Sequence, residues 1–241
     1  TAVALAGGDD ALKAKAEHGL AAISDAAPET RASPAFLRAL FDDFATTFDD
    51  QLVNDLDYRV PALVARAARD RRPTDGYDVA LDAGCGTGLL GLEALAVARL
   101  VGADVSSKMC AAARARTWDD GSKVYDAVFE GDLLDADLYK AALAPPSDDD
   151  PTSANHLKAD LVAAADVLCY FGDLTAILAR WADAIRPGGD AIFTVEALDD
   201  DCRSWVLEPS GRYAHSKAHV AATAAAAIAS HPPSFLMSLD A

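Results

Sequence analysis

The chain has 241 residues, 51% of them hydrophobic and 24% charged, which is enough for one large domain with a buried core. No apolar run approaches the ~20 residues of a membrane span, and 21 basic against 38 acidic residues give a net charge of −17, so neither a membrane nor a nucleic acid is an expected partner. The four cysteines have no CxxC spacing, as expected of reduced thiols in a cytoplasmic protein.

The first 75 residues are predicted to be helical. A helix over residues 11–24 is followed by the proline-bounded break 28–34. An apolar stripe at helical spacing then predicts a helix that either packs in the core or covers a site, and its members are Phe36, Leu37, Leu40, Phe41, Phe44 and Phe48. Pro61 can open a third helix at its first turn, with Leu63, Val64 and Ala67 facing inward.

From residue 77 onward, short apolar strands alternate with helices. Strands are expected at 77–82, 100–104, 127–131, 160–165 and 190–196. Helices are expected between them, namely one that carries Leu89, Leu92 and Leu95, then 107–116, 137–143 and 173–185, with a polar loop at 145–158. This alternation predicts an α/β fold with a doubly wound, mostly parallel sheet.

The most informative segment follows the first strand. Asp82 ends that strand, and Gly84, Gly86 and Gly88 come next, where a positive φ or a ligand against the bare backbone requires glycine. A phosphate-binding P-loop would need a lysine, which this loop lacks. A dinucleotide fingerprint can be read only from Gly86, four residues past the strand end, which is too late for that motif. S-adenosylmethionine fits this loop better. It has no phosphate, its anionic end is a single carboxylate, and it also carries an ammonium and a sulfonium, so it calls for an acid at the strand end and glycines, but for no basic residue.

Residues 82–88, Asp-Ala-Gly-Cys-Gly-Thr-Gly, resemble the first motif of class I S-adenosylmethionine-dependent methyltransferases. Four further segments follow in that family's order, at 102–106, 130–133, 164–168 and 186–189. The resemblance implies a Rossmann-like fold in which Asp104 binds the ribose, Asp132 lies near the adenine amine and Asp166 faces the methyl group. The cofactor site that it implies comprises Asp82, Gly84, Cys85, Gly86, Gly88, Asp104, Val105, Met109, Asp132, Leu133 and Asp166.

A narrower resemblance covers residues 40–61 and 210–216, which are similar to a group of methyltransferases often preceded by tetratricopeptide repeats. It implies a helical extension at 1–33 and a methyltransferase domain at 34–241. Within that domain we expect a helical lid (34–75), a cofactor-binding core (76–196) and a substrate-side segment (197–241). The family closes its sheet with an antiparallel pair of strands. Only residues 234–239 are left to supply one, so we expect the final strand to be missing or displaced.

Several residues are candidates for the acceptor side. His215 could be the catalytic base or an acceptor-orienting donor, or else a structural histidine. Arg212 could bind an acceptor carboxylate, or instead a nearby aspartate. Asp166 and Tyr170 are the other catalytic candidates, and Tyr170 could equally be core. Phe44 and Phe48 are candidate substrate contacts.

We expect no metal, because consecutive loop aspartates such as 199–201 are usually solvated and hard cations need several convergent oxygens. The leading hypothesis is methyl transfer by direct displacement to an oxygen, nitrogen or sulfur atom of a small molecule. The alternatives are an NAD-dependent oxidoreductase and a non-catalytic, partner-binding subunit on the same fold. The sequence does not indicate an oligomeric state.

Overall fold

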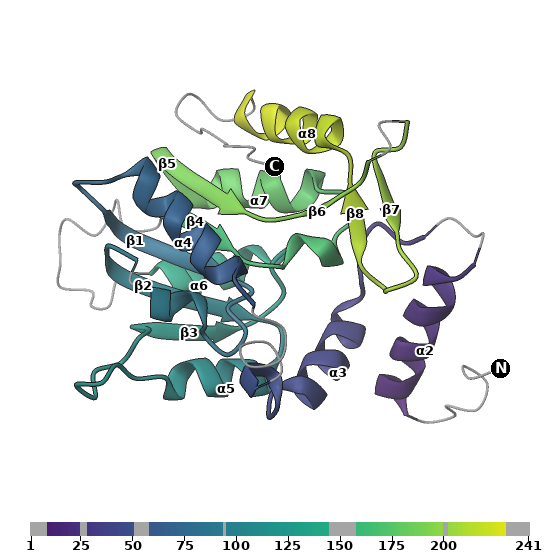
Figure 1. Ribbon diagram of the computed structural model, residues 1–241, viewed down its shortest axis with the longest axis horizontal. Coiled ribbons are helices and arrows are strands. Elements are labelled where there is room, and N and C mark those ends of the chain that lie inside the picture. The colour runs from purple at the N-terminus through teal and green to yellow at the C-terminus, as the bar shows by residue number, and fades with distance from the viewer. Residues whose placement is uncertain are drawn as a thin grey trace.

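The centre of the molecule is a five-stranded parallel sheet in the order β3-β2-β1-β4-β5 (Figure 1). The computed structural model describes residues 9–24, 28–50, 58–93, 95–144, 158–199 and 202–229. The strands are β1 (Tyr77–Ala83), β2 (Val97–Asp104), β3 (Ala127–Glu130), β4 (Ala159–Ala164) and β5 (Ile185–Phe193). The predicted α/β fold with a Rossmann-like parallel sheet is therefore confirmed.

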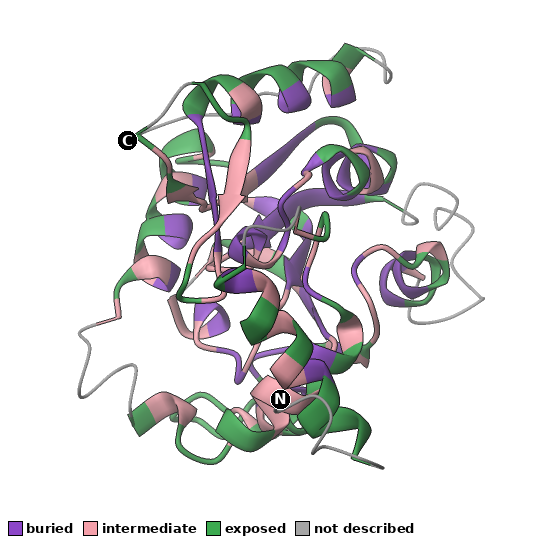
Figure 2. Ribbon diagram, turned by 90° about the vertical axis from the view of Figure 1, so that its right-hand side faces the viewer, coloured by how far each residue is buried: buried purple, intermediate pink, exposed green. Residues whose placement is uncertain are grey.

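Helices cover both faces of this sheet, as a doubly wound fold requires. One face carries α4 (Val60–Arg71), the 3-10 helix η2 (Leu90–Glu93) and α5 (Ser107–Ala115). The other carries α6 (Ala136–Leu143), α7 (Thr175–Ala184) and α8 (Lys217–Ala229). In Figure 2 the central strands are buried, while the outer helices turn exposed faces to the solvent.

Alternation along each strand builds two separate cores. In β1, Val79 and Leu81 pack toward α6 and α7, whereas Ala80 between them packs toward α4 and α5. In β4, Val162 belongs to the first of these cores and Leu161 to the second. Because side chains of a strand point alternately to opposite faces, near-continuous apolar runs are what a sheet covered on both sides needs.

A second group of elements lies beyond the carboxyl ends of the five strands. It contains α2 (Asp10–Ala22), α3 (Pro34–Phe44) and a small sheet of β6 (Glu196–Ala197), β7 (Trp205–Leu207) and β8 (Tyr213–His215) (Figure 1). The side-chain oxygen of Ser33 accepts the N–H of Phe36 at 3.2 Å and Pro34 follows it, so α3 begins where an N-cap and a first-turn proline coincide. These elements cover the carboxyl edge of the five-stranded sheet.

Three expectations from the sequence are wrong in detail. The helix expected after the glycine loop is only the four-residue η2, and the N–H of Gly91 within it donates to the hydroxyl of Tyr125 at 3.1 Å. In α4, Val64 is buried as expected, but Leu63 is 55% exposed, and Ala68 rather than the half-buried Ala67 is fully buried. The fifth strand begins at Ile185 rather than residue 190, since the chain pairs with β4 directly after α7.

Two other expectations, the loop at 145–158 apart from its last residue and the strand at 234–239, lie outside the described residues. Among the helices of the described part of the chain, none is long and apolar enough to cross a bilayer.

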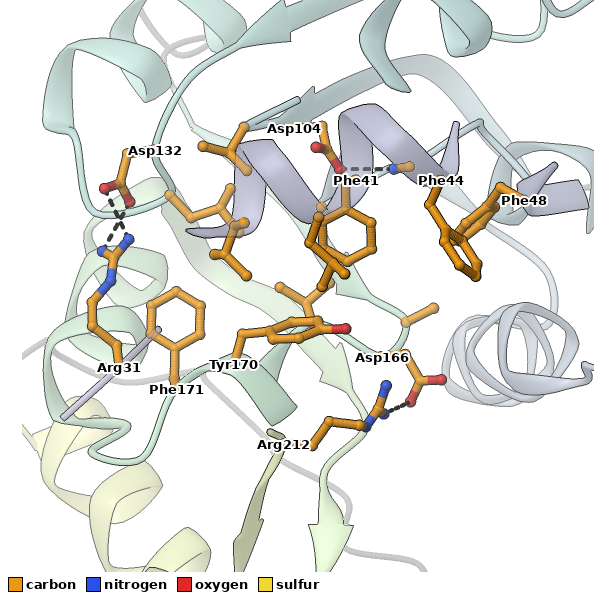
Figure 3. Close-up of a pocket in the computed structure, with 18 of the residues that line it drawn as sticks. Arg31, Phe41, Phe44, Phe48, Asp104, Asp132, Asp166, Tyr170, Phe171 and Arg212 are labelled. Carbon is orange, nitrogen blue, oxygen red and sulfur yellow. Dashed lines mark hydrogen bonds and ion pairs between the residues drawn. The ribbon is translucent and has the colours of Figure 1, made fainter. Parts of the chain in front are cut away.

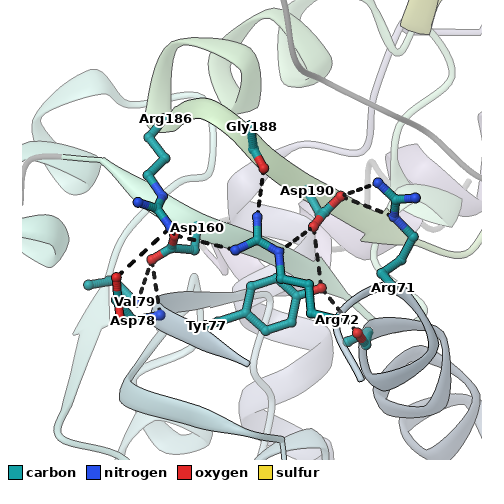
Figure 4. A network of polar contacts seen from close by, with 10 residues as sticks. Arg71, Arg72, Tyr77, Asp78, Val79, Asp160, Arg186, Gly188 and Asp190 are labelled. Atoms are coloured by element: carbon teal, nitrogen blue, oxygen red, sulfur yellow. Dashed lines mark hydrogen bonds and ion pairs between the residues drawn. The ribbon is translucent and has the colours of Figure 1, made fainter. Parts of the chain in front are cut away.

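A cluster of buried charges closes the opposite, amino end of the sheet (Figure 4). Asp160 of β4 and Asp190 of β5 have side chains only 2% and 4% exposed. Asp190 pairs with Arg71 at 3.1 Å and with Arg72 at 3.0 Å, and Asp160 pairs with Arg186. This cluster joins α4 to two neighbouring strands far from the carboxyl edge, which leaves that edge for function.

Candidate functional site

A cavity of about 460 Å³ opens at the carboxyl ends of the strands, between the sheet and α3. Ligands of open α/β sheets bind at this edge. The polar part of the wall has three aspartates and two arginines, namely Asp104, Asp132, Asp166, Arg31 and Arg212. The apolar part is mainly Leu37, Leu40, Phe41, Phe44, Phe48 and Tyr170. Figure 3 shows one Arg–Asp pair at each side of the pocket, with Tyr170 between them.

The glycine loop forms one wall of the cavity. Gly84 has φ +78°, and a Cβ there would lie 2.4 Å from Cγ2 of Val167, so neither the backbone nor the space admits another residue. Gly86 has φ +51°, and its N–H donates to Oδ2 of Asp104 at 3.0 Å. The loop is thus folded around the carboxylate at the end of β2.

Replacing Gly84 with alanine is expected to lower the free energy of unfolding by about 1–3 kcal/mol, through the positive φ and the overlap with Val167. Gly121→Ala is the matched control, because Gly121 has φ +84° but no atom within 4 Å of an added Cβ. Urea unfolding of both variants measures the difference. Equal losses would mean that the contact with Val167 costs nothing.

Asp104 is the best-buried carboxylate of the cavity wall, 8% exposed. Its Oδ1 accepts the N–H of Ser106 at 2.8 Å, and its Oδ2 accepts the N–H of Gly86. Burial raises the pKa of Asp104, while these two backbone donors oppose that rise. An ionised carboxylate offers about four lone-pair positions, and the backbone N–H groups of Ser106, Gly86 and Val105 take up only part of this capacity, so the rest is left for a ligand in the cavity.

Seven of the eleven implied cofactor residues line the cavity, and four do not. Those that line it are Gly84, Gly86, Asp104, Val105, Asp132, Leu133 and Asp166. Asp82, Cys85 and Met109 are buried, and Gly88 faces Tyr125 and Ala113. Cys85 and Gly88 belong to the glycine loop, Asp82 precedes it at the end of β1, and Met109 lies in α5, so these four residues are placed outside the cavity wall.

Asp82 makes the stability of this region depend on pH. Burial raises its pKa to about 7, the hydroxyl of Tyr125 donating at 2.6 Å opposes the rise, and the charge of Asp104 adds to it. The folded protein therefore keeps a proton that the unfolded chain releases near pH 3.8. The stability contributed by that proton is present below pH 3.8 and is lost as the pH rises through about 7.

Asp82→Asn mimics the protonated form and does not titrate. Between about pH 5 and about pH 8 the melting temperature of the unmodified protein should therefore fall by a few degrees relative to that of the variant. Thermal unfolding followed by circular dichroism across this range measures the gain. A difference between the two proteins that stays constant with pH would contradict the prediction.

Asp132 is held by an arginine that the sequence did not single out. The guanidinium of Arg31 donates to both carboxylate oxygens, at 3.0 Å each, and lies 5.1 Å from the centre of the Phe171 ring. The segment around Arg31 is itself fixed, since the N–H of Ala32 donates to the carbonyl of Tyr170 at 2.8 Å. Arg31 and Asp132 are 101 residues apart, so no local signal could have paired them.

Two aspartates fasten the aromatic stripe over the glycine loop. Asp42 accepts the hydroxyl of Ser106 at 2.6 Å, and Asp49 accepts that of Thr87 at 2.5 Å. Phe36 is buried in a small core with Ala14 and Ala32, whereas Phe41, Phe44 and Phe48 line the cavity. The stripe therefore contributes both to the core and to the cover of the site.

Asp166 lies at the other end of the cavity in a strained conformation. Its φ is +58°, which is unusual for a residue other than glycine, and its N–H donates to Oγ1 of Thr194 at 3.0 Å. Arg212 pairs with Asp166 at 3.3 Å and also with Glu196, and its guanidinium lies 5.7 Å from the centre of the Tyr170 ring. Of the two alternatives for Arg212, the structure shows the pairing with a nearby aspartate.

Tyr58 is a further cavity residue that the sequence did not single out. Burial raises its pKa, and the charge of Asp166 and a hydrogen bond to it act in the same direction. In the described part of the chain, no three or more His, Cys, Asp or Glu side chains are grouped to hold a metal ion.

His215 does not line the cavity, contrary to the expectation that it meets the acceptor. It is 1% exposed, and its Nε2–H donates to the carbonyl of Phe171 at 2.7 Å. Burial lowers its pKa, which keeps the ring neutral. Among the described residues its Nδ1 has no hydrogen-bond partner. The position fits the structural alternative, in which His215 fixes the turn that carries Tyr170 and Phe171.

The parallel sheet in the order 3-2-1-4-5, the glycine loop after β1 and the acid at the end of β2 together define the class I methyltransferase fold. Residues 81–191 match a family model described as a methyltransferase domain. The chain is thus similar, over these residues, to a methyltransferase domain. No curated protein matches it.

Solved structures share this fold. A chain from a complex of the methyltransferase activator Trm112 of Haloferax volcanii is 23% identical, with a TM-score of 0.53 over 78% of this chain and 75% of its own. The N-methyltransferase NodS from Bradyrhizobium japonicum, crystallised with S-adenosylhomocysteine, is 19% identical, with a TM-score of 0.53 over 79% and 85%. YcgJ from Bacillus subtilis is 18% identical, with a TM-score of 0.50 over 71% and 68%. At these identities, the likeness establishes the fold alone.

Proposed function

We propose that this protein transfers a methyl group from S-adenosylmethionine to a small-molecule acceptor by direct displacement. The observation that carries the proposal is Asp104, whose carboxylate accepts the N–H of Gly86 in the glycine loop and also lines the cavity with acceptor capacity left for a ligand. A ribose offers two adjacent hydroxyls that can donate to this carboxylate. When bound, the cofactor supplies an electrophilic methyl group on a sulfonium. The sulfur leaves as a neutral thioether, so no acid is needed to protonate the leaving group.

The other cavity residues would hold the rest of the cofactor. The backbone of Gly84 and Gly86 leaves the methionine end room to approach, because neither residue carries a side chain. Asp132 can accept the adenine amino group, either beside Arg31 or after Arg31 releases it. The aromatic side chains above the loop exclude water from the reacting atoms, which is the protein's main task in a displacement of this kind.

A small acceptor fits the cavity better than a macromolecule does. Its free space beyond the cofactor residues is walled by Phe41, Phe44, Phe48 and Tyr170. The net charge of −17 opposes nucleic acid. The proposed division is a helical extension to residue 33 and a methyltransferase domain from residue 34, in which 34–75 serve as the lid and the segment from 197 serves the substrate side. The likeness to methyltransferases that follow tetratricopeptide repeats stays a prediction.

Calorimetric titration with S-adenosylhomocysteine tests the function. We expect saturable binding at micromolar concentrations of this ligand, and no binding of NADH. Binding of NADH alone would favour the oxidoreductase alternative. Cofactor binding without methylation of any compound in a metabolite extract, together with a stable complex recovered from cells, would favour the partner-binding subunit.

A further inference from the structure

Both arginines of the cavity are already neutralised by carboxylates. Arg31 is engaged in a two-pronged pair with Asp132. Arg212 faces two acids at once, Asp166 at 3.3 Å and Glu196. Its side chain is only 29% exposed, so it has little freedom to turn toward another partner. Within the described wall of the cavity, no arginine is left to bind an anionic acceptor.

The acceptor end of the cavity has an excess of negative charge. Around Arg212, the carboxylates of Asp166 and Glu196 face one guanidinium, so among the described residues this group has one more negative than positive charge; the neutral hydroxyl of Tyr58, which also bonds to Asp166, does not change that balance. The side chain of Asp166 is 32% exposed and lines the cavity, so this charge is accessible to a ligand. A negative charge at the wall of a water-poor cavity attracts a cation and repels an anion, and solvent screens this preference less than it does at the surface.

Aromatic rings surround the same end of the cavity. Phe41 meets Tyr170 edge-on with 5.5 Å between ring centres, and Phe48 stands 6.5 Å from Phe41 and 6.1 Å from Phe44. In Figure 3 the rings of Phe44 and Phe48 lie on the same side of the pocket as Asp166, and those of Phe41 and Tyr170 lie toward its middle. Ring faces attract ammonium groups, and their edges and carbon atoms accommodate an apolar body. Carboxylate and rings together are the usual surroundings of an organic cation.

We propose that the methyl acceptor is an amine on an apolar or aromatic body, held as an ammonium by Asp166 and the rings of Phe41, Phe44, Phe48 and Tyr170. The inference rests on the proposed function and specifies its substrate class. Asp166 accepts an N–H of the amine and takes the proton that the nitrogen must lose, which then passes to water. The freed lone pair forms the nitrogen–carbon bond as the carbon–sulfur bond of the donor breaks, so the sulfur leaves neutral.

The test is binding of three probes with the same body to the protein loaded with S-adenosylhomocysteine. Phenethylamine is a cation at neutral pH, phenethyl alcohol is neutral and phenylacetate is an anion. Calorimetry should rank them in that order, with the amine at least about tenfold tighter than the carboxylate. Asp166→Asn should reduce the ratio of amine to alcohol affinity about tenfold. Asp173→Asn, in the loop after Phe171 and outside the cavity wall, should leave the ratio unchanged.

The outcomes separate this inference from the function itself. Binding of S-adenosylhomocysteine with equal or tighter binding of phenylacetate overturns the amine, but leaves the methyltransferase standing. Binding of no probe at millimolar concentration does the same. An unchanged ratio in Asp166→Asn removes Asp166 from recognition, and a general loss of folding would instead weaken all three probes alike. Failure of S-adenosylhomocysteine to bind overturns both proposals.

Discussion

Replacing Asp104 with alanine is expected to weaken the binding of S-adenosylhomocysteine by at least about 100-fold. Two hydrogen bonds from ribose hydroxyls to a charged acceptor are worth roughly 1.5–3 kcal/mol each, and both are lost together. The N–H groups of Gly86 and Ser106 also lose their acceptor, so the glycine loop loosens as the ligand contacts vanish. Calorimetry at neutral pH measures the loss directly.

Two variants control this experiment. Asp104→Asn keeps the volume and one oxygen, so its affinity should lie between those of the unmodified protein and the alanine variant. Asp126 lies outside the cavity wall, and its side chain accepts at 2.7 Å the N–H of Leu100, a residue of the same strand β2 as Asp104. Asp126→Ala therefore removes a comparable backbone acceptor without touching the ligand and should leave the affinity unchanged. A folded Asp104→Ala variant that binds normally would show that this carboxylate does not meet the cofactor.

The central sheet could be predicted from the sequence because its strands carry their own signals. A strand buried on both faces is a short apolar run between polar turns, as at 77–82 and 160–165. Helix η2 could not be predicted in this way, since its Gly91 N–H donates to the hydroxyl of Tyr125, a contact 34 residues later in the chain that leaves no local pattern. The strands β7 and β8 have three residues each, too few for any periodicity to appear.

Site residues could be predicted where they follow directly after a strand. They could not be predicted where their role depends on a contact with a residue distant in the sequence. Gly84, Gly86 and Asp104 lie next to strand ends, and their roles follow from where those strands end. Arg31 could not be found, because its importance comes from Asp132, a residue on another element. His215 was a candidate because histidine titrates near neutral pH, but burial against the carbonyl of Phe171 removes it from the cavity. Residue chemistry alone cannot reveal such placement.

The largest loss of stability is expected far from the cavity, at Asp160. Its buried carboxylate accepts the N–H of Val79 at 2.8 Å and that of Asp78 at 3.1 Å, and it pairs with Arg186. Asp160→Ala leaves the N–H groups of Asp78 and Val79 without this acceptor, and it leaves Arg186, among the described residues, with only Asp78, at 3.9 Å. Leaving buried backbone donors without an acceptor costs roughly 1–3 kcal/mol each, because they stay desolvated. Urea unfolding followed by circular dichroism measures the change.

Burial, rather than the ion pair as such, is what makes Asp160 important. Asp137 pairs with Lys140 at 2.6 Å, but both side chains are at least 75% exposed, so Asp137→Ala should leave the unfolding midpoint unchanged. Asp160→Asn keeps an oxygen that can accept the N–H of Val79 and loses only the charge. Its unfolding midpoint should therefore lie between those of Asp160→Ala and Asp137→Ala. If Asp160→Ala and Asp137→Ala shifted the midpoint equally, the cluster at the amino edge would contribute no more than a surface pair, and α4 would be held to the sheet by its apolar face alone.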